Sequence, residues 1–409
     1  MASAPVAIEL DDHVVEVSKP SKALFASGVT KLDLARYMEA VAPALLRHVA
    51  DRPLNLQRFP DGVDKHGIFQ QQLPSYFPHW IDRTSTPKQG GSVTHVVATD
   101  AATLVYLANQ ACVSLHMWLS RRDRLDRPDR LILDLDPSGG NDDDVRQAAL
   151  TIGAILRDEL GLPPFALATG SRGYHVVVPL QRRHEHDEVR AFARDLGRLA
   201  VVREPRRLTL AQRRINRGGR ILVDVQRNAY AHTAVAPYSV RALPAATCAA
   251  PLAWEELEER RMRPDRWSIR SLPARLARDG DPWEQLAADP QPPRPRPQNA
   301  RRAAGRGGDR RLSACSIREP LAASVLRDLA MREDALHARV DVLALRVSRP
   351  QLGPDDGRHG GVGVGAAVPA DVQLARARLV ADRAHAAALR RWDHRRRHDS
   401  AHRLWAVSS

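Results

Sequence analysis

Cysteine is scarce in this chain, and long apolar runs are absent. Only three of its 409 residues are cysteines, Cys112, Cys248 and Cys315, and no two of them form a C-x-x-C pair. This spacing argues against a disulfide framework or a cysteine-based zinc site and fits a reducing cytoplasm. No stretch approaches the roughly 18 uncharged apolar residues of a membrane span, and acidic Glu9 and Asp11 lie where a signal peptide would be apolar. We therefore expect a cytoplasmic protein with no membrane partner.

Lysine is missing from the C-terminal part of the chain, which is nevertheless strongly basic. Residues 291–409 contain 23 arginines, 12 acidic residues and no lysine, so most of the net charge of +14 lies there. A balance this basic favours a polyanionic partner, with nucleic acid before a membrane surface. The first 290 residues carry little net charge, so any nucleic-acid site within them must be a local patch.

A change of composition near residue 290 predicts two parts. The run Gln291-Pro-Pro-Arg-Pro-Arg-Pro is typical of a linker. We expect a folded domain over 1–290 and a linker with a basic, largely disordered tail over 291–409, containing amphipathic helices near 320–346 and 371–392. The tail is either an arm that binds DNA phosphates or non-functional sequence, for instance an out-of-frame extension in a GC-rich gene.

Strand and helix patterns alternate along the first 290 residues. Short apolar runs predict strands at 13–17, 54–59, 93–97, 113–118, 165–169, 174–178 and 221–225. Apolar residues at helical spacing and N-cap signals predict helices after Thr30, over 100–110, after 141–144 and over 181–199. Such alternation indicates an α/β or α+β fold.

The stretch Leu131–Gly140 carries two carboxylates in an apolar run that ends in a Pro-Ser-Gly-Gly turn. This pattern predicts a strand, on which side chains two residues apart point to the same face. Asp134 and Asp136 therefore share a face and repel each other, a conflict that Mg²⁺ or Mn²⁺ would remove. An isolated pair of this kind is more often a solvated strand end, so the rest of the chain must decide between the two interpretations.

Two further features could belong to the same site. The turn Thr169–His175 combines glycines, small hydroxyls and an arginine, which can bind phosphate, although most such turns are simple hairpins. Asp224 lies in an apolar strand, where an acid needs a partner or an edge position. Together, Asp134, Asp136 and Asp224 could supply ligands for two metal ions.

Several segments occur in an order that resembles one family. They are Asp134-Leu-Asp-Pro, Gly170-Ser-Arg-Gly-Tyr-His-Val, Leu222-Val-Asp, Thr233–Arg241, Arg52–Gly62, Asp100–Gln110 and Gly280-Asp-Pro-Trp283. Over about residues 6–288 the chain resembles the polymerase domain of bacterial DNA ligase D, which belongs to the archaeo-eukaryotic primase superfamily. The resemblance implies an α/β (α+β) primase-polymerase fold, with a catalytic β-sheet bearing the carboxylates, flanking helices and a second small α/β lobe.

The resemblance also implies a function. It is template-directed nucleotidyl transfer in non-homologous end joining, in which gaps are filled and ends extended from nucleoside triphosphates, with ribonucleotides preferred, by a two-metal mechanism using Mn²⁺ or Mg²⁺. The implied partners are DNA ends with a 5′-phosphate, Ku and a separate ATP-dependent DNA ligase, in the nucleoid-associated cytoplasm. A non-catalytic scaffold that bridges DNA ends and a de novo primase remain alternatives.

The family's functional residues can be carried over position by position. The catalytic and metal-binding carboxylates are Asp134, Asp136 and Asp224. The nucleotide-binding residues are His116, Thr169, Ser171, Arg172, His175, Arg217 and Arg241. The DNA-binding residues are Lys22 and Lys31 for the 5′-phosphate, Arg58, and Phe69 for stacking on the template.

The chain departs from the family pattern in three places near these residues. Ile68 stands where an aromatic residue is usual, Gln71 where a basic residue is common, and Arg227 where a glutamine is usual. No K-x-D-G adenylation motif occurs in the sequence. We therefore expect a stand-alone polymerase without DNA ligase activity.

Deletion of residues 291–409 tests the two interpretations of the tail. If the tail is a DNA-binding arm, its removal should make the affinity for DNA less sensitive to salt, by about 0.9 in the log–log slope for each phosphate that the arm neutralises. Fluorescence-anisotropy titrations at several salt concentrations measure this slope. An unchanged slope would rule out the arm.

Overall fold

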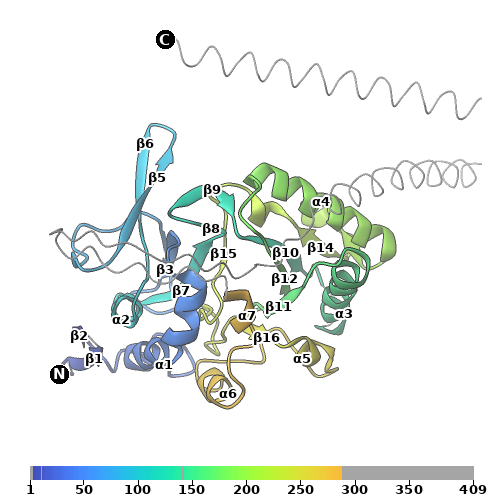
Figure 1. Cartoon of the computed structure of the whole chain (residues 1–409). Helices are drawn as coiled ribbons and strands as arrows, with labels where there is room; N and C mark the ends of the chain where they lie inside the picture. Colours follow the sequence, from blue (N-terminus) through green and yellow to red (C-terminus); the bar gives the residue numbers. More distant parts are fainter. Residues whose placement is uncertain (1–2, 11, 140–141, 288–409) are drawn as a thin grey trace, which may run out of the picture. The chain divides into compact units, whose positions relative to one another are not determined.

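The computed structural model describes residues 3–10, 12–139 and 142–287. Within these residues the chain forms two six-stranded β-sheets and two two-stranded ribbons, with helices packed around them (Figure 1). No helix in these ranges is long and apolar enough to cross a membrane. The tail over 291–409, with the helices expected near 320–346 and 371–392, lies outside the described residues.

One sheet carries all three of the predicted metal-binding carboxylates, and we call it the carboxylate sheet. In spatial order its strands are β13 (Leu208–Thr209), β14 (Ile221–Asp224), β10 (Arg130–Asp136), β12 (Tyr174–Pro179), β11 (Phe165–Ala168) and β16 (Ala250–Leu252). Neighbouring strands are antiparallel except for the parallel pair β13–β14.

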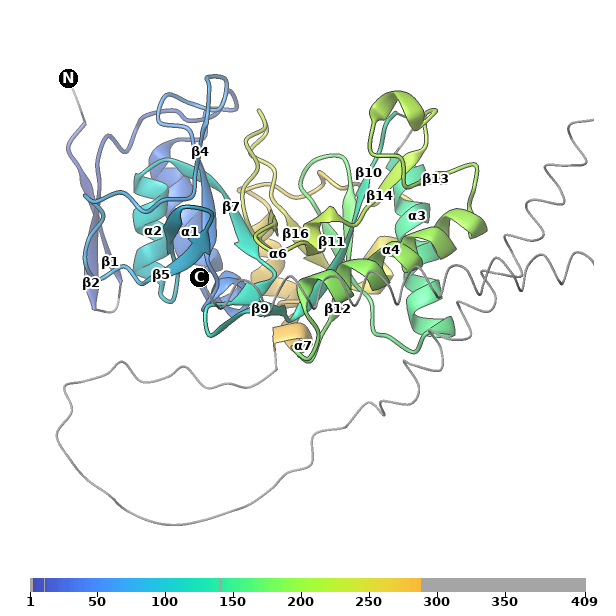
Figure 2. The same ribbon diagram turned by 90° about the horizontal axis from the view of Figure 1, so that it is seen from above.

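The two faces of the carboxylate sheet have different surroundings. Leu131, Leu133 and Leu135 are buried in a core with residues of α3 (Asp142–Ala154) and α4 (His186–Arg203), which lie beside this sheet in Figure 2. Because side chains alternate along a strand, Asp134 and Asp136 point to the opposite face. The two carboxylates thus share a face, as their spacing predicts, and it is the face opposite α3 and α4.

The second sheet forms the other lobe. Its strands are β15 (Thr233–Val235), β7 (Cys112–Trp118), β3 (Leu54–Arg58), β6 (Gly91–Val96) and β5 (Arg83–Lys88), with β4 (Ile68–Gln70) paired to β3. A separate core joins this sheet to α1 (Lys31–Val49) and α2 (Ala101–Asn109). The α/β architecture expected from the resemblance is thus confirmed, and the second lobe has a sheet of its own.

The remaining elements are short. They are the ribbons β1 (Val6–Leu10) with β2 (His13–Val17) and β8 (Ser120–Arg121) with β9 (Arg124–Pro128), the helices α5 (Trp254–Glu258), α6 (Leu272–Asp279) and α7 (Glu284–Ala287), and the helical turns Ile155–Glu159, Arg214–Asn216 and Gln226–Asn228.

Helix starts follow local hydrogen bonding. Thr30 caps α1, because its hydroxyl accepts from the backbone N–H of Asp33 while the Asp33 carboxylate accepts from the N–H of Thr30. The helix expected from residue 181 begins at His186 instead. The Glu188 carboxylate accepts from the backbone N–H of Glu185 at 2.8 Å, which places the cap there. The other predicted strands and helices appear with ends shifted by one or a few residues.

A buried polar network ties α1 to the segment before α7. The Nδ1 atom of His48 lies 3.4 Å from a guanidinium nitrogen of Arg130, which can only donate, so Nδ1 must be unprotonated. The Nε2–H of His48 then donates to Asp281 at 3.1 Å, and Tyr238 donates to the other oxygen of Asp281 at 2.7 Å. Burial lowers the pKa of His48 from 6.5 to about 4. The folded protein therefore holds His48 neutral.

This network predicts loss of stability on acidification from pH 6.5 toward pH 4. In that window the unfolded chain binds a proton at His48 that the folded chain excludes, so the free energy of unfolding falls by about 1.4 kcal/mol per pH unit. Urea unfolding at a series of pH values measures the slope. His48→Gln, which can keep both hydrogen bonds, should flatten it, whereas substitution of the exposed His66 by Gln should not.

Candidate active site

The register of the carboxylate sheet brings the predicted catalytic residues together. Asp134 on β10 lies directly opposite Asp224 on β14 and directly opposite His175 on β12. Directly opposed residues share a face, and Asp136 lies on the same face two positions further along β10. Four residues from three separate segments of the chain therefore converge on the face that α3 and α4 leave free.

Each carboxylate on β10 is paired with an arginine. Arg217 donates from Nη1 to Asp136 at 3.1 Å, and its guanidinium also donates to the carbonyls of Ala211 and Gln212. Arg227 donates from Nε to Asp134 at 3.1 Å. The sequence marked Arg227 only as a departure from the family pattern and did not predict its pairing with Asp134.

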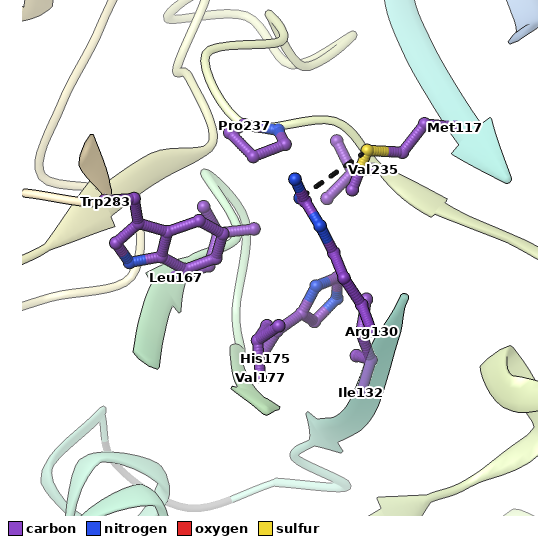
Figure 3. A pocket seen from close by; sticks show the side chains of 9 residues that line it. All are labelled: Met117, Arg130, Ile132, Leu167, His175, Val177, Val235, Pro237 and Trp283. Carbon is purple, nitrogen blue, oxygen red and sulfur yellow. Dashed lines mark hydrogen bonds between the residues drawn. The ribbon is translucent and has the colours of Figure 1, made fainter. Parts of the chain in front are cut away.

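His175 lies between the carboxylates and an apolar space. Its Nε2 atom is 3.5 Å from Asp134, whereas its buried Nδ1 atom has no hydrogen-bond partner among the described residues. Figure 3 shows the His175 ring in a pocket between the sheets, lined also by Met117, Arg130, Ile132, Leu167, Val177, Val235, Pro237 and Trp283. Burial lowers the pKa of His175, and the favourable charge of Asp134 only partly opposes this effect. His175 is therefore a neutral hydrogen-bonding group.

The turn between β11 and β12 is fixed by backbone packing at its glycines. Gly170 has a φ of +69°, and a Cβ there would lie 2.6 Å from the carbonyl carbon of Cys248. A Cβ at Gly173 would lie 2.1 Å from the carbonyl oxygen of Leu135. Thr169 closes the turn by donating its hydroxyl to the Gly173 carbonyl at 2.7 Å. The turn thus packs against the end of β10 at Leu135, the residue between Asp134 and Asp136.

The outer residues of this turn remain accessible. Ser171 is partly exposed and Arg172 is exposed, while Thr169 is buried. Thr247 donates its hydroxyl to the carbonyl of Gly170, a contact that no local sequence pattern predicts. Ser171 and Arg172 are thereby held on a rigid turn and can contact a ligand.

Residues from the second sheet complete the site. The pKa of His116, on β7, falls from 6.5 to about 3, chiefly through burial and then through the charges of Arg241 and Arg227. Burial also lowers the pKa of Arg241, which the charge of Asp134 partly counteracts. Arg241 is thus coupled to Asp134, and His116 is coupled to Arg241 and Arg227.

Phe69 extends the site along β4. Its ring packs edge-on against His116 at 5.8 Å between centroids, yet 54% of the residue is exposed. Ile68 beside it is exposed as well. An exposed aromatic ring next to the nucleotide residues suits stacking on a base.

Arg58 and the two lysines continue from Phe69 along the second lobe. Arg58 donates to the side chain of Gln70 at 2.9 Å and to the carbonyl of Gln110 at 3.0 Å. Next to Gln110, the carbonyl of Asn109 accepts from Lys31 at 3.2 Å. Contacts through adjacent residues thus lead from Arg58 to Lys31, one of the two predicted 5′-phosphate lysines.

The ammonium group of Lys31 is almost buried among neutral oxygens. It donates to the hydroxyl of Ser18 at 3.0 Å and to both side-chain and backbone oxygens of Asn109. Burial lowers its pKa, and Lys22 and Lys19 lower it further. Lys22 donates to the carbonyl of Pro60 and lies 3.4 Å from Asp61. The positive charges gathered here favour an anion. Sequence reasoning missed Ser18 and Asn109 because nothing in their local sequence marks them.

Comparison with known proteins identifies the family. The family model described as "LigD, primase-polymerase domain" matches residues 30–283. The chain belongs to the LigD primase-polymerase family. The matched range includes all the predicted site residues except Lys22, and it contains the strands of both six-stranded sheets. The expected family is therefore confirmed.

Relatives and a solved structure agree with this assignment. The chain is 32% identical over 288 residues to a protein of Mycobacterium bovis called "Multifunctional non-homologous end joining protein LigD", and 34% identical over 276 residues to a protein of the same name from Pseudomonas aeruginosa. Each match covers 67% of this chain but only 37% and 33% of the relatives, so the chain matches about a third of their length. It also resembles the "Polymerase Domain from Mycobacterium tuberculosis Ligase D in complex with DNA", with a TM-score of 0.64, 30% identity, and coverage of 67% of this chain and 98% of that chain.

The donor chemistry of a LigD primase-polymerase site suits hard divalent cations. Asp134, Asp136 and Asp224 offer carboxylate oxygens, which Mg²⁺ and Mn²⁺ prefer. Across residues 3–10, 12–139 and 142–287, however, no three His, Cys, Asp or Glu side chains are grouped closely enough to hold a metal ion. In this arrangement the positive charge beside Asp134 and Asp136 comes from Arg227 and Arg217.

The packing of Gly173 predicts a sharp sensitivity to size. Gly173→Ala would force a methyl group against the Leu135 carbonyl, so β10 or the turn must move, at a cost of about 3 kcal/mol. The variant should unfold at a lower urea concentration and bind a nucleoside triphosphate more weakly than the wild type. Gly139→Ala is the matched control, because a Cβ at Gly139 meets nothing within 4 Å. Equal stability of the two variants would contradict the packing argument.

Proposed function

We propose that this chain catalyses template-directed nucleotidyl transfer at DNA ends in non-homologous end joining, filling gaps and extending ends. The observation that carries the proposal is the β10–β14–β12 register, which sets Asp134 opposite both Asp224 and His175 beside a glycine turn. Membership of the LigD primase-polymerase family and the likeness to a polymerase domain solved with DNA support it.

The carboxylates are proposed to hold the divalent cations. Asp134, Asp136 and Asp224 would be their ligands, either Mn²⁺ or Mg²⁺. Such ions, when bound, activate a 3′-hydroxyl and stabilise negative charge on the transferring phosphate.

The surrounding residues are proposed to bind and orient the nucleoside triphosphate. Thr169, Ser171 and Arg172 on the glycine turn would contact its phosphates, with further guanidinium contacts from Arg217 and Arg241. His175 and His116 are neutral, so they act as hydrogen-bonding and packing groups rather than as cations. Their low pKa values keep these roles constant across physiological pH.

The second lobe is proposed to bind the DNA. Phe69 would stack on the template base next to the incoming nucleotide, and Arg58 supports the same surface through Gln70. Lys22 and Lys31 would bind the 5′-phosphate on the far side of a gap. This phosphate site favours a broken or gapped end over the substrate of a de novo primase.

The substrate preferences follow from the family and are part of the proposal. Ribonucleotides are preferred over deoxynucleotides, and Ku and a separate ATP-dependent DNA ligase act on the same ends. Primer extension on a gapped duplex, with or without the 5′-phosphate, with both nucleotide types in Mn²⁺ or Mg²⁺, tests these points. No extension under any of these conditions would refute the proposed activity.

Substitution of the carboxylates separates catalysis from binding. Asp134→Ala and Asp224→Ala should each lower the extension rate by about 100-fold or more, the order seen when one group that stabilises transition-state charge is removed. DNA affinity, measured by anisotropy, should change little. Asp187→Ala, an exposed acid at the start of α4, is the control. Full activity in both site variants would refute the catalytic role of these carboxylates, whereas no extension even by the wild type would favour a non-catalytic scaffold.

A further inference from the structure

The backbone of Arg227 is fixed by its neighbours, whereas its side chain makes a single hydrogen bond among the described residues. Its turn, Gln226–Asn228, is fixed at both ends. The N–H of Gln226 donates to Asp224 at 2.9 Å, and the side chain of Asn228 bonds to both the N–H and the carbonyl of Ile132 on β10. The guanidinium of Arg227 makes a single hydrogen bond within the described residues, to Asp134, and 42% of its side chain is exposed.

Arg217, the partner of Asp136 in the same site, is anchored at several points. Its side chain is only 11% exposed, and its guanidinium is held by the carbonyls of Ala211 and Gln212 as well as by Asp136. Release of Asp136 would leave Arg217 anchored. Release of Asp134 would free Arg227 to swing into solvent or onto another anion.

Both oxygens of Asp134 are engaged in this arrangement. Oδ2 accepts from Arg227, and Oδ1 faces Nε2 of His175 at 3.5 Å. A guanidinium 3.1 Å from the carboxylate opposes the approach of any other cation to the same oxygens. A divalent ion therefore binds Asp134 more tightly when Arg227 withdraws.

We propose that Arg227 is an exchangeable internal cation that competes with the divalent metal for Asp134 and is drawn away by the triphosphate of the incoming nucleotide. The inference rests on the proposed function, since it concerns the same carboxylates and nucleotide. Guanidinium groups bind phosphate in a bidentate manner, so a triphosphate is the anion best suited to hold the released side chain. Metal and nucleotide then load cooperatively, because each favours the released position of Arg227.

Arg227→Gln tests the inference through binding alone. Without nucleotide, the variant should bind Mn²⁺ about tenfold more tightly than the wild type, measured by the electron paramagnetic resonance signal of free Mn²⁺. In the presence of a chelator, without metal, it should bind a non-hydrolysable nucleoside triphosphate about tenfold more weakly, measured by fluorescence titration. A purely structural effect would weaken both ligands together, so opposite changes identify the competition.

Arg127→Gln is the matched control, because it removes the same charge from an ion pair with Glu185 between β9 and α4. It should leave both affinities unchanged. Equal Mn²⁺ affinity of the wild type and Arg227→Gln would overturn the inference, while primer extension by the wild type would still uphold the proposed function. Failure of both proteins to bind Mn²⁺ and to extend primers would overturn both.

Discussion

The antiparallel register of β10 with β14 and β12 is the constraint on which the site depends. It sets Asp134 against Asp224 and His175 and leaves Asp136 on the same face. Negative charge concentrated on one face of a sheet needs compensation, and the protein supplies it with Arg217 and Arg227. Arg217 has further anchors and stays beside Asp136, whereas Arg227 has none among the described residues and can leave Asp134.

Burial shapes the rest of the electrostatics. His116 and His175 lie where the two sheets approach each other, and their low pKa values leave them uncharged. The positive potential beside the carboxylates therefore comes from arginines, which stay charged at any physiological pH. His48 is held neutral by the same effect in the network that binds α1 to Asp281, which makes the stability of the fold sensitive to acid.

The departures from the family pattern at Ile68 and Arg227 fall on exposed or half-buried positions rather than in the two cores. Ile68 is exposed on β4 beside Phe69, where a template base would stack. Arg227 contacts a proposed metal ligand directly. The sheets of this LigD primase-polymerase domain thus match its relatives, while contacts to the template and to the metal are where this chain is expected to differ.

The sequence alone predicted which residues would carry the chemistry and that Asp134 and Asp136 share one face of a strand. The spacing of Asp134 and Asp136, the glycines around the turn and the order of the motifs indicated the family, because strand periodicity and turn chemistry are local properties. Only the tertiary structure decided which strands are neighbours. Pairing of β10 with β14 and β12 brings together residues some forty to ninety positions apart, and no local pattern encodes that register. The Arg227–Asp134 pair and the oxygens of Ser18 and Asn109 around Lys31 likewise depend on long-range packing, which places side chains with ordinary sequence surroundings beside charged partners.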